Sequence, residues 1–332
     1  MNSYERVMGV LAGQKVDRTP VIPILMAFAA RYLGKTYRDF YLDHRVLVES
    51  YLRCLKDFQL DMVMVISDPF RETEGFGATF TYPETSVPVM KDPVLTDIAH
   101  VGKLRKPDLQ KAARMADRLA AVAYFHREVG GEVPILGWVE GPVAEAGDLR
   151  GLQELMMDFF DNPEPVRELL EMTTAVALDF AKAQIEAGAD MIGIGDAAAS
   201  LFSPQTYREF ILPYEQRLIA GIHAAGAKVK LHICGNITNL LPDLAATGAD
   251  MIDLDWMVGL KTARQLLGGR VALCGNIDPV SVILHGKPED IEAASRNCLA
   301  EADGPFILSA GCEIPVDTPP ENLAALCRAV RT

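Results

Sequence analysis

Short apolar segments alternate with longer amphipathic segments along almost the whole chain, and this alternation constrains the fold more than any other feature. The apolar segments are rich in Val, Ile, Leu or Met and are bounded by Gly, Pro or Asp. Such runs are typical of strands that are buried in a parallel sheet. Eight strands are predicted, at residues 21–27, 61–67, 134–140, 190–196, 228–235, 251–255, 271–277 and 306–311.

Helix signals lie between these segments. Asn162 and Pro163 precede an apolar stripe of helical spacing, and Gly188 follows where a helix-ending glycine is expected. A second helix is expected from Ser203 to about His223. Eight strands that alternate with helices favour an α/β fold of the (β/α)8, or TIM-barrel, type, and a doubly wound open sheet is the alternative.

The segment between the second and third predicted strands, about residues 69–133, is the main irregularity in this pattern. It contains a hairpin-like pair, residues 78–82 and 86–90, and then a helix pattern from about 109 to 129. No linker-like composition flanks the segment. We therefore interpret it as a loop insertion, and we expect residues 1–332 to form a single barrel domain.

Aspartates mark both ends of three predicted strands. The carboxyl ends of barrel strands surround the catalytic mouth, whereas their amino ends lie on the opposite, stabilising face. We therefore expect Asp68, Asp196 and Asp255 to lie at the mouth. Asp61, Asp190 and Asp250 are expected to cap the amino ends of the strands.

A possible metal site follows from the end of the fifth predicted strand. Alternate residues of a strand share a face, so His232 and Cys234 point the same way. Cys312 follows the last predicted strand and supplies a third soft donor at the same end of the barrel. One imidazole and two thiolates with an open fourth position are typical of catalytic zinc.

The same cysteines also allow a purely structural interpretation, because a buried cysteine often behaves as a small apolar residue. From the spacing alone, metal binding and packing remain open for Cys234 and Cys312. Cys274 lies near the predicted mouth, where packing is favoured over ligation. Cys54, Cys298 and Cys327 lie on helical stripes and are expected in the core.

Composition excludes several classes of function. The chain has 32 Lys and Arg against 45 Asp and Glu, a formal net charge of −13, which argues against nucleic acid and anionic lipid as partners. Six cysteines in 332 residues are too few for a disulfide scaffold. No apolar stretch is long enough for a membrane span, so we expect a cytoplasmic protein with reduced thiols.

Several segments of the chain resemble the uroporphyrinogen decarboxylase superfamily, over nearly its full length. The matching segments are residues 17–21, 31–33, 67–68, 141–142, 275–279 and 318–322. The resemblance implies a (β/α)8 barrel. It also implies one of two activities, a metal-free decarboxylation of tetrapyrrole precursors or a zinc-dependent methyl transfer that involves a corrinoid.

The decarboxylase pattern is incomplete. The resemblance places two arginines near residues 27 and 31, but only Arg31 is present, and Ala27 stands at the other position. The histidine that is expected near the C-terminus is replaced by Cys312. Among the decarboxylase positions, the aspartate at Asp68 matches well.

The corrinoid-dependent methyltransferase branch has a His-x-Cys pair and a distant Cys, which bind zinc. His232, Cys234 and Cys312 match this pattern in order and spacing. The resemblance therefore implies Zn²⁺ as cofactor. No Asp-x-His-x-x-Gly segment is present, so the cobalamin is expected on a separate corrinoid protein.

The resemblance also implies roles for residues around the metal ligands. Glu140, Asp68 and Asp196 are candidate catalytic acids, each as a proton carrier, a fourth metal ligand or a carboxylate that supports a ligand. Glu140 is preferred, because it ends an otherwise apolar strand and burial of an acid is costly unless it serves a purpose. Arg31, Asp255 and Asn276 are candidates for binding substrate. The small substrate is a thiol such as coenzyme M, or a methoxylated or methylated compound. The direction of transfer stays open.

Two alternatives to methyl transfer remain at this point. One is decarboxylation by a uroporphyrinogen decarboxylase that has diverged at Ala27 and Cys312. The other is a non-catalytic subunit that binds the corrinoid partner.

Overall fold

A curled parallel sheet forms the centre of the computed structural model, which describes residues 1–331. Its seven strands run in the order β1-β4-β5-β6-β7-β8-β9, and every neighbouring pair is parallel. The strands are β1 (Val63–Met64), β4 (Ile135–Glu140), β5 (Met191–Gly195), β6 (Lys228–His232), β7 (Met251–Leu254), β8 (Ala272–Ile277) and β9 (Phe306–Ala310). This is a TIM-barrel-like arrangement.

The first predicted strand is wrong as a regular strand. Only Val21 pairs, in an isolated bridge to Leu308, and helix α2 (Met26–Tyr32) begins within the predicted range. Pro20 and Pro23 explain this, because proline has no backbone N–H to donate to a ladder. The backbone N–H of Asp61 still donates to the Val21 carbonyl at 3.0 Å, so this short piece connects β9 with the segment that leads into β1.

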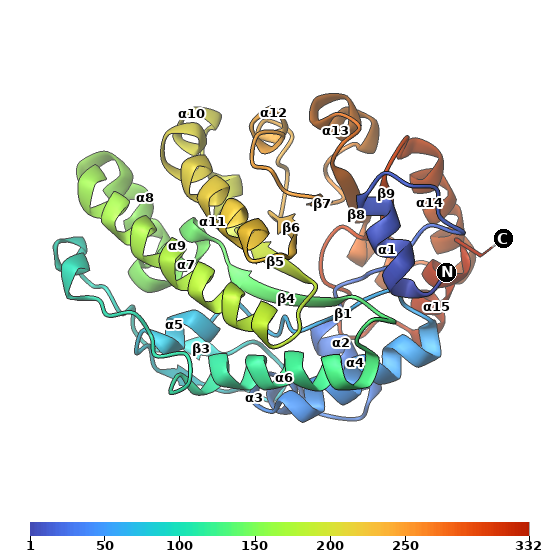
Figure 1. Ribbon diagram of the computed structural model, residues 1–332, viewed down its shortest axis with the longest axis horizontal. Coiled ribbons are helices and arrows are strands. Elements are labelled where there is room, and N and C mark those ends of the chain that lie inside the picture. Colours follow the sequence, from blue (N-terminus) through green and yellow to red (C-terminus); the bar gives the residue numbers. More distant parts are fainter. Residues whose placement is uncertain (332) are drawn as a thin grey trace.

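Helices cover the outside of the sheet, as Figure 1 shows. Helix α9 packs on β4, α11 on β6, and α13 and α14 on β8. The main helices are α1 (Ser3–Leu11), α3 (Tyr37–Leu42), α4 (His44–Phe58), α5 (Arg71–Gly75), α6 (Ala113–Val129), α7 (Pro142–Arg150), α8 (Leu152–Asp161), α9 (Pro163–Glu186), α11 (Leu212–Ala224), α12 (Leu241–Leu244), α13 (Leu260–Leu267), α14 (Pro288–Glu301) and α15 (Pro320–Arg328).

The helix predicted from Ser203 to His223 is interrupted. It consists of α10 (Pro204–Thr206), a π-helical turn over Tyr207–Ile211, and then α11. Pro213 lies in the first turn of α11. Because proline cannot donate to the preceding turn, the backbone widens there and the helix restarts.

The segment between β1 and β4 contains the elements that its sequence predicts. Two short strands, β2 (Phe80–Thr81) and β3 (Val89–Met90), pair antiparallel, and α6 follows. Helix α6 starts four residues later than the apolar pattern indicates. It packs against α4 and against β4, beside the main sheet.

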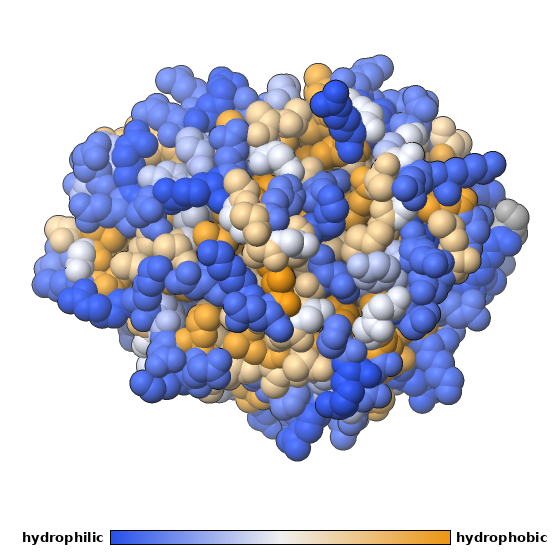
Figure 2. All heavy atoms as spheres, viewed as in Figure 1, coloured by the Kyte–Doolittle hydropathy of each residue, from blue (hydrophilic) through white to orange (hydrophobic). Residues whose placement is uncertain are grey.

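Aspartates cap the amino ends of the strands as predicted. Asp61 accepts the backbone N–H of Val21, Asp190 that of Ile135 and Asp250 that of Val229, each at 2.8–2.9 Å. Hydrophilic residues cover most of the outer surface in the view of Figure 2, and apolar residues show between them. Among residues 1–331, no helix is long and apolar enough to cross a membrane.

Candidate metal centre

Three soft donors meet at the carboxyl end of the sheet. His232 ends β6, Cys234 follows it by two residues, and Cys312 lies just after β9. The His232 Nε2 atom lies 2.9 Å from Cys234 Sγ and 4.0 Å from Cys312 Sγ, and the two Sγ atoms are 3.9 Å apart. Two strands separate β6 from β9 in the sheet, so it is the curl of the sheet that brings these donors together.

This donor set fits a tetrahedral zinc ion. Ordinary zinc–ligand bonds place two sulfur ligands about 3.8 Å apart and a sulfur and a nitrogen ligand about 3.6 Å apart. The Cys234–Cys312 and His232–Cys312 distances of 3.9 Å and 4.0 Å are close to these values. The His232–Cys234 distance of 2.9 Å is a hydrogen-bond distance, and ligation needs it to widen by roughly 0.7 Å.

Asp253 holds the imidazole of His232 from behind. Its Oδ2 lies 3.0 Å from His232 Nδ1 and 2.8 Å from the Nζ of Lys230, which is fully buried. Burial opposes charge on His232, but the hydrogen bonds to Asp253 and Cys312 raise its pKa to about 10. This contact leaves Nε2 directed at the two cysteines, as in metal sites where a carboxylate orients the ligating histidine.

The two thiols are not equivalent. The hydrogen bond from Cys234, aided by His232, lowers the pKa of Cys312 to about 4 against the opposing effect of burial. The same contact and burial raise the pKa of Cys234 above its ordinary value. Of the two cysteines, Cys312 is therefore the one whose thiolate form is favoured by its neighbours.

Glu140 lies at the same level as His232 in the sheet. Backbone register aligns Glu140, Gly195 and His232 on three neighbouring strands. The indole N–H of Trp138 donates to Glu140 Oε1 at 3.2 Å, and the Trp138 ring centroid is 6.3 Å from that of His232. A Cβ on Gly193, in the neighbouring strand β5, would overlap the Trp138 ring, so a glycine is needed there for this indole to fit.

Buried arginines hold the acids on this side of the mouth. Arg71 is fully buried and its Nη2 donates to Glu140 Oε1 at 2.7 Å. Arg114 forms an ion pair with Asp68, which also accepts from the Ser67 hydroxyl at 2.7 Å. Burial by itself would raise the pKa of Asp68, but the positive charges of Arg114 and Arg71 outweigh it and lower this pKa.

Asp196 is fully buried next to α7. Its Oδ1 accepts the backbone N–H of Ala144 at 2.7 Å, in the first turn of that helix. Burial, with the nearby Glu215 adding to it, raises the pKa of Asp196 well above its ordinary value. The predicted catalytic acids therefore lie in different surroundings, and of the three only Glu140 is connected to His232 through Trp138.

The three predicted substrate-binding residues are dispersed around the mouth. Asp255 accepts the backbone N–H of Gly235 at 2.8 Å, beside the donor cluster. Asn276 donates to the carbonyl oxygen of Val258 at 2.6 Å. Arg31 is more than half exposed and forms an ion pair with Asp317 at 3.4 Å.

The other cysteines lie outside the donor cluster. Cys54, Cys274 and Cys327 are buried in the core, and Cys298 is half-buried against it. All six cysteines are free thiols. Packing, the favoured interpretation for Cys274, agrees with its burial within β8.

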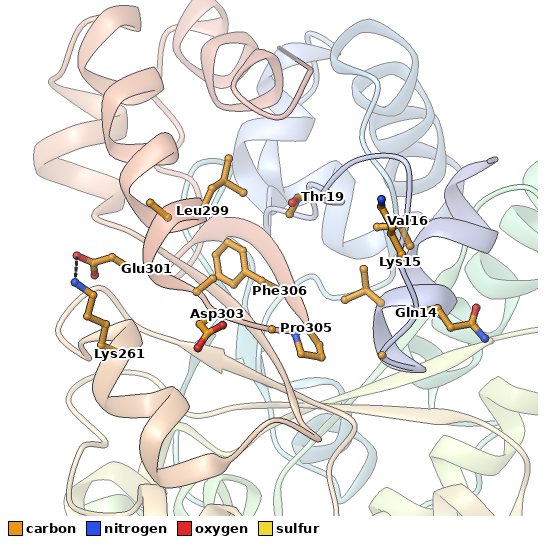
Figure 3. Close-up of a pocket in the computed structure, with 15 residues that line it drawn as sticks. Gln14, Lys15, Val16, Thr19, Lys261, Leu299, Glu301, Asp303, Pro305 and Phe306 are labelled. Atoms are coloured by element: carbon orange, nitrogen blue, oxygen red, sulfur yellow. Dashed lines mark ion pairs between the residues drawn. The ribbon is translucent and has the colours of Figure 1, made fainter.

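A larger cavity lies at the opposite end of the sheet. Its volume is about 880 Å³, and it is lined by the loop after α1 and by the residues that precede β9. Figure 3 shows Lys261 and Glu301 turned toward each other at its edge, and their ion pair measures 3.4 Å. Because barrel chemistry takes place at the carboxyl ends of the strands, this cavity is not the candidate site.

Asp253, Lys230 and Arg71 are the important residues that sequence reasoning missed. An available signal was the period of two along β6, which places Lys230 on the same face as His232. Asp253 is an acid within the buried apolar strand β7, just as Glu140 is an acid at the end of the buried strand β4. Arg71 is the first residue of α5, a helix of five residues that is too short for a periodic pattern to indicate the orientation of its side chain.

Comparison with known proteins identifies the family of the chain. The sequence profile described as Uroporphyrinogen decarboxylase (URO-D) matches residues 2–332. The chain belongs to the uroporphyrinogen decarboxylase family. It is 31% identical to a protein named uroporphyrinogen decarboxylase from Xanthomonas axonopodis pv. citri, over 100% of this chain and 99% of that protein. A protein of the same name from Idiomarina loihiensis is 30% identical over 98% and 95%, respectively.

A solved structure described as a methyltransferase from Methanosarcina mazei superposes closely. The TM-score is 0.91 with 26% identity, over 99% of this chain and 98% of that one. By sequence, the chain belongs to the uroporphyrinogen decarboxylase family. By structure, the chain shares its fold with a protein that is described as a methyltransferase. These two resemblances suggest different reactions, so the residues of the mouth have to discriminate between them.

Proposed function

We propose that this member of the family is a zinc-dependent methyltransferase that moves a methyl group between a corrinoid protein and a small substrate. The observation that carries the proposal is the convergence of His232, Cys234 and Cys312 at the mouth, with all donor atoms within 4.8 Å of one another. The close superposition on a methyltransferase supports the same reaction.

His232, Cys234 and Cys312 would hold the zinc. When bound there, zinc would lower the pKa of a substrate thiol or polarise the leaving atom of a methyl donor. Asp253 holds His232 in the tautomer that presents Nε2 to the metal, and the buried Lys230 balances the Asp253 charge. Glu140, kept in place by Arg71 and Trp138, is the acid best placed to exchange a proton with the substrate.

A decarboxylase of tetrapyrrole biosynthesis is the second candidate, and the 31% identity to a uroporphyrinogen decarboxylase favours it. The residues at the mouth of the sheet argue against decarboxylation. Ala27 leaves Arg31 as the one arginine of the expected pair, and Arg31 is engaged by Asp317. Cys312 takes part in the donor cluster in place of the expected histidine. A substrate with many carboxylates would also meet the acidic residues Glu140 and Asp148.

Metal analysis combined with two activity assays tests the proposal. We expect about one zinc per chain and demethylation of methylcobalamin by at least one thiol of a panel, or methylation of cob(I)alamin by a methoxylated compound or methylated amine. A metal-free protein that converts uroporphyrinogen would establish the decarboxylase instead. Zinc or cobalamin binding without any methyl transfer would indicate a non-catalytic partner subunit.

The Asp253→Asn variant is expected to bind zinc about 10- to 100-fold more weakly, because second-shell carboxylates orient the ligating imidazole. Competition with a chromogenic chelator measures this change. Asp250→Asn is the matched control, since Asp250 lies at the opposite end of β7 and caps Val229. Equal zinc affinity in both variants would contradict the role of Asp253.

A further inference from the structure

A small cavity lies beside Glu140 at the mouth of the sheet. Its volume is about 310 Å³, and its walls include Ala144 and Gly147 of α7 and Leu201 after β5. Two carboxyl groups, those of Glu140 and Asp148, line it. Among the residues that the structure describes, no Lys, Arg or His lines this cavity. It is therefore an apolar pocket that carries acidic groups.

This cavity borders the metal centre. Ser200 lines it, and the Ser200 hydroxyl lies 3.8 Å from the position of a Cβ on Gly235, the residue that follows Cys234. Glu140 is two strands from His232 at the same level, a separation of about 10 Å between their Cα atoms. The cavity therefore lies beside the segment that follows Cys234.

The carboxyl groups of the cavity have free hydrogen-bonding capacity. Arg71 and Trp138 both donate to Oε1 of Glu140, whose side chain is only 7% exposed. Within residues 1–331, neither Glu140 Oε2 nor the oxygens of Asp148 receive a hydrogen bond. Glu140 is buried and Asp148 is half-buried. Oxygens that lack a partner at such a site are suited to a ligand that donates hydrogen bonds or supplies positive charge.

Acidic side chains gather around the cavity. Asp68 and Glu72 lie near Asp148, and the Arg71 charge only partly offsets them. Burial, with Glu72 and Asp68 adding to it, raises the pKa of Asp148 to about 8, so it holds a proton at neutral pH. The 197–201 turn that forms the facing wall contributes no charged side chain. A cation that enters would release this proton and pair with the carboxylate.

We propose that this cavity binds a positively charged amine, protonated or quaternary, that forms part of the small substrate. The proposal rests on the proposed function, and it identifies the class of substrate. Acidic groups within apolar walls are suited to alkylammonium ions, because a nearby cation favours the ionised form of the acid. Sulfonates and carboxylates are disfavoured there. The amine would occupy the cavity while the reacting end of the substrate lies at His232, Cys234 and Cys312.

Three thiols of similar length test the proposal. They are 2-(trimethylammonio)ethanethiol, whose nitrogen cannot bind a metal, its uncharged carbon isostere 3,3-dimethylbutane-1-thiol, and the anionic 2-mercaptoethanesulfonate. Titration of the cobalt(II)-substituted protein, followed by the thiolate-to-cobalt absorption band, gives each affinity without any methyl transfer. The cationic thiol is expected to bind roughly tenfold or more tightly than its isostere, and the sulfonate more weakly than the cationic thiol.

Two variants assign the preference to the cavity. Asp148→Asn is expected to remove most of the preference for the cationic thiol. Glu145→Gln is the matched control, because Glu145 is a buried acid of the same helix that bonds to Thr73 and does not line the cavity. Equal binding of the cationic thiol and its isostere, stronger binding of the sulfonate, or an equal effect of both variants would overturn the proposal.

A measurement without metal separates this proposal from the proposed function. If the protein takes up no metal, the methyltransferase proposal fails, and calorimetry with tetramethylammonium then decides the cavity. Saturable binding that Asp148→Asn weakens supports an amine site. Absence of such binding overturns it.

Discussion

The Cys312→Ser variant is expected to purify with almost no zinc and to lose methyl transfer. Cys312 follows β9, whereas His232 and Cys234 lie at the end of β6, and two strands separate β6 from β9 in the sheet. Without Cys312, only His232 and Cys234 remain as donors. Loss of a direct ligand should weaken zinc binding by more than the roughly 100-fold upper effect of a second-shell residue. Elemental analysis of the purified variant, together with the methylcobalamin assay, measures both effects.

Two serine variants serve as controls for Cys312→Ser. Cys298 is half-buried on α14 and Cys274 is buried in β8, and both lie outside the donor cluster. Both variants are therefore expected to keep their zinc. The ligand assignment is wrong if Cys274→Ser loses the metal while Cys312→Ser retains it. Circular dichroism of each variant verifies that metal loss does not reflect unfolding.

The Arg71→Met variant is expected to be less stable than the parent protein by about 3–5 kcal/mol. Arg71 is fully buried, with ion pairs to Glu140 at 2.7 Å and to Glu72 at 3.5 Å. Methionine fills much of the same volume but leaves these carboxylates without a counter-charge in a desolvated environment. The free energy of unfolding from chemical denaturation at neutral pH is the measurement.

An exposed ion pair provides the comparison for Arg71→Met. Arg53 pairs with Asp57 on α4, and its side chain is 55% exposed. Arg53→Met should therefore cost less than about 1 kcal/mol, because solvent screens such pairs. A loss of similar size in both variants would show that Arg71 does not compensate the buried acids. Partial recovery of Arg71→Met at lower pH is also expected, since protonated carboxyls need no counter-charge.

Local sequence was sufficient to predict the elements of the sheet, and it failed where proline acts. Seven of the predicted strands form the sheet, because buried parallel strands need continuous apolar runs. The remaining predicted strand, the first along the chain at residues 21–27, is equally apolar. Pro20 and Pro23 reduce it to a single bridge. Pro213 interrupts a predicted helix for the same reason.

Donor identity could also be predicted from the sequence. The period of two along β6 puts His232 and Cys234 on one face, and their distance of 2.9 Å agrees with this. The position of Cys312 after the last strand places it at the same end of the sheet. Family resemblance then indicated which cysteines to group, and the family assignment is confirmed by the profile match over residues 2–332.

By itself, the sequence determined most of the helices and strands, the end of the sheet at which His232, Cys234 and Cys312 lie, and which side chains are potential ligands. These properties follow from residues close together along the chain. Only the tertiary structure decided that donors from β6 and β9 meet, that Asp253 and Lys230 lie behind His232, and that Glu140 and Asp148 line one cavity. The physical reason is that such contacts depend on the curl of the sheet and on side-chain packing between distant segments, which no local pattern encodes.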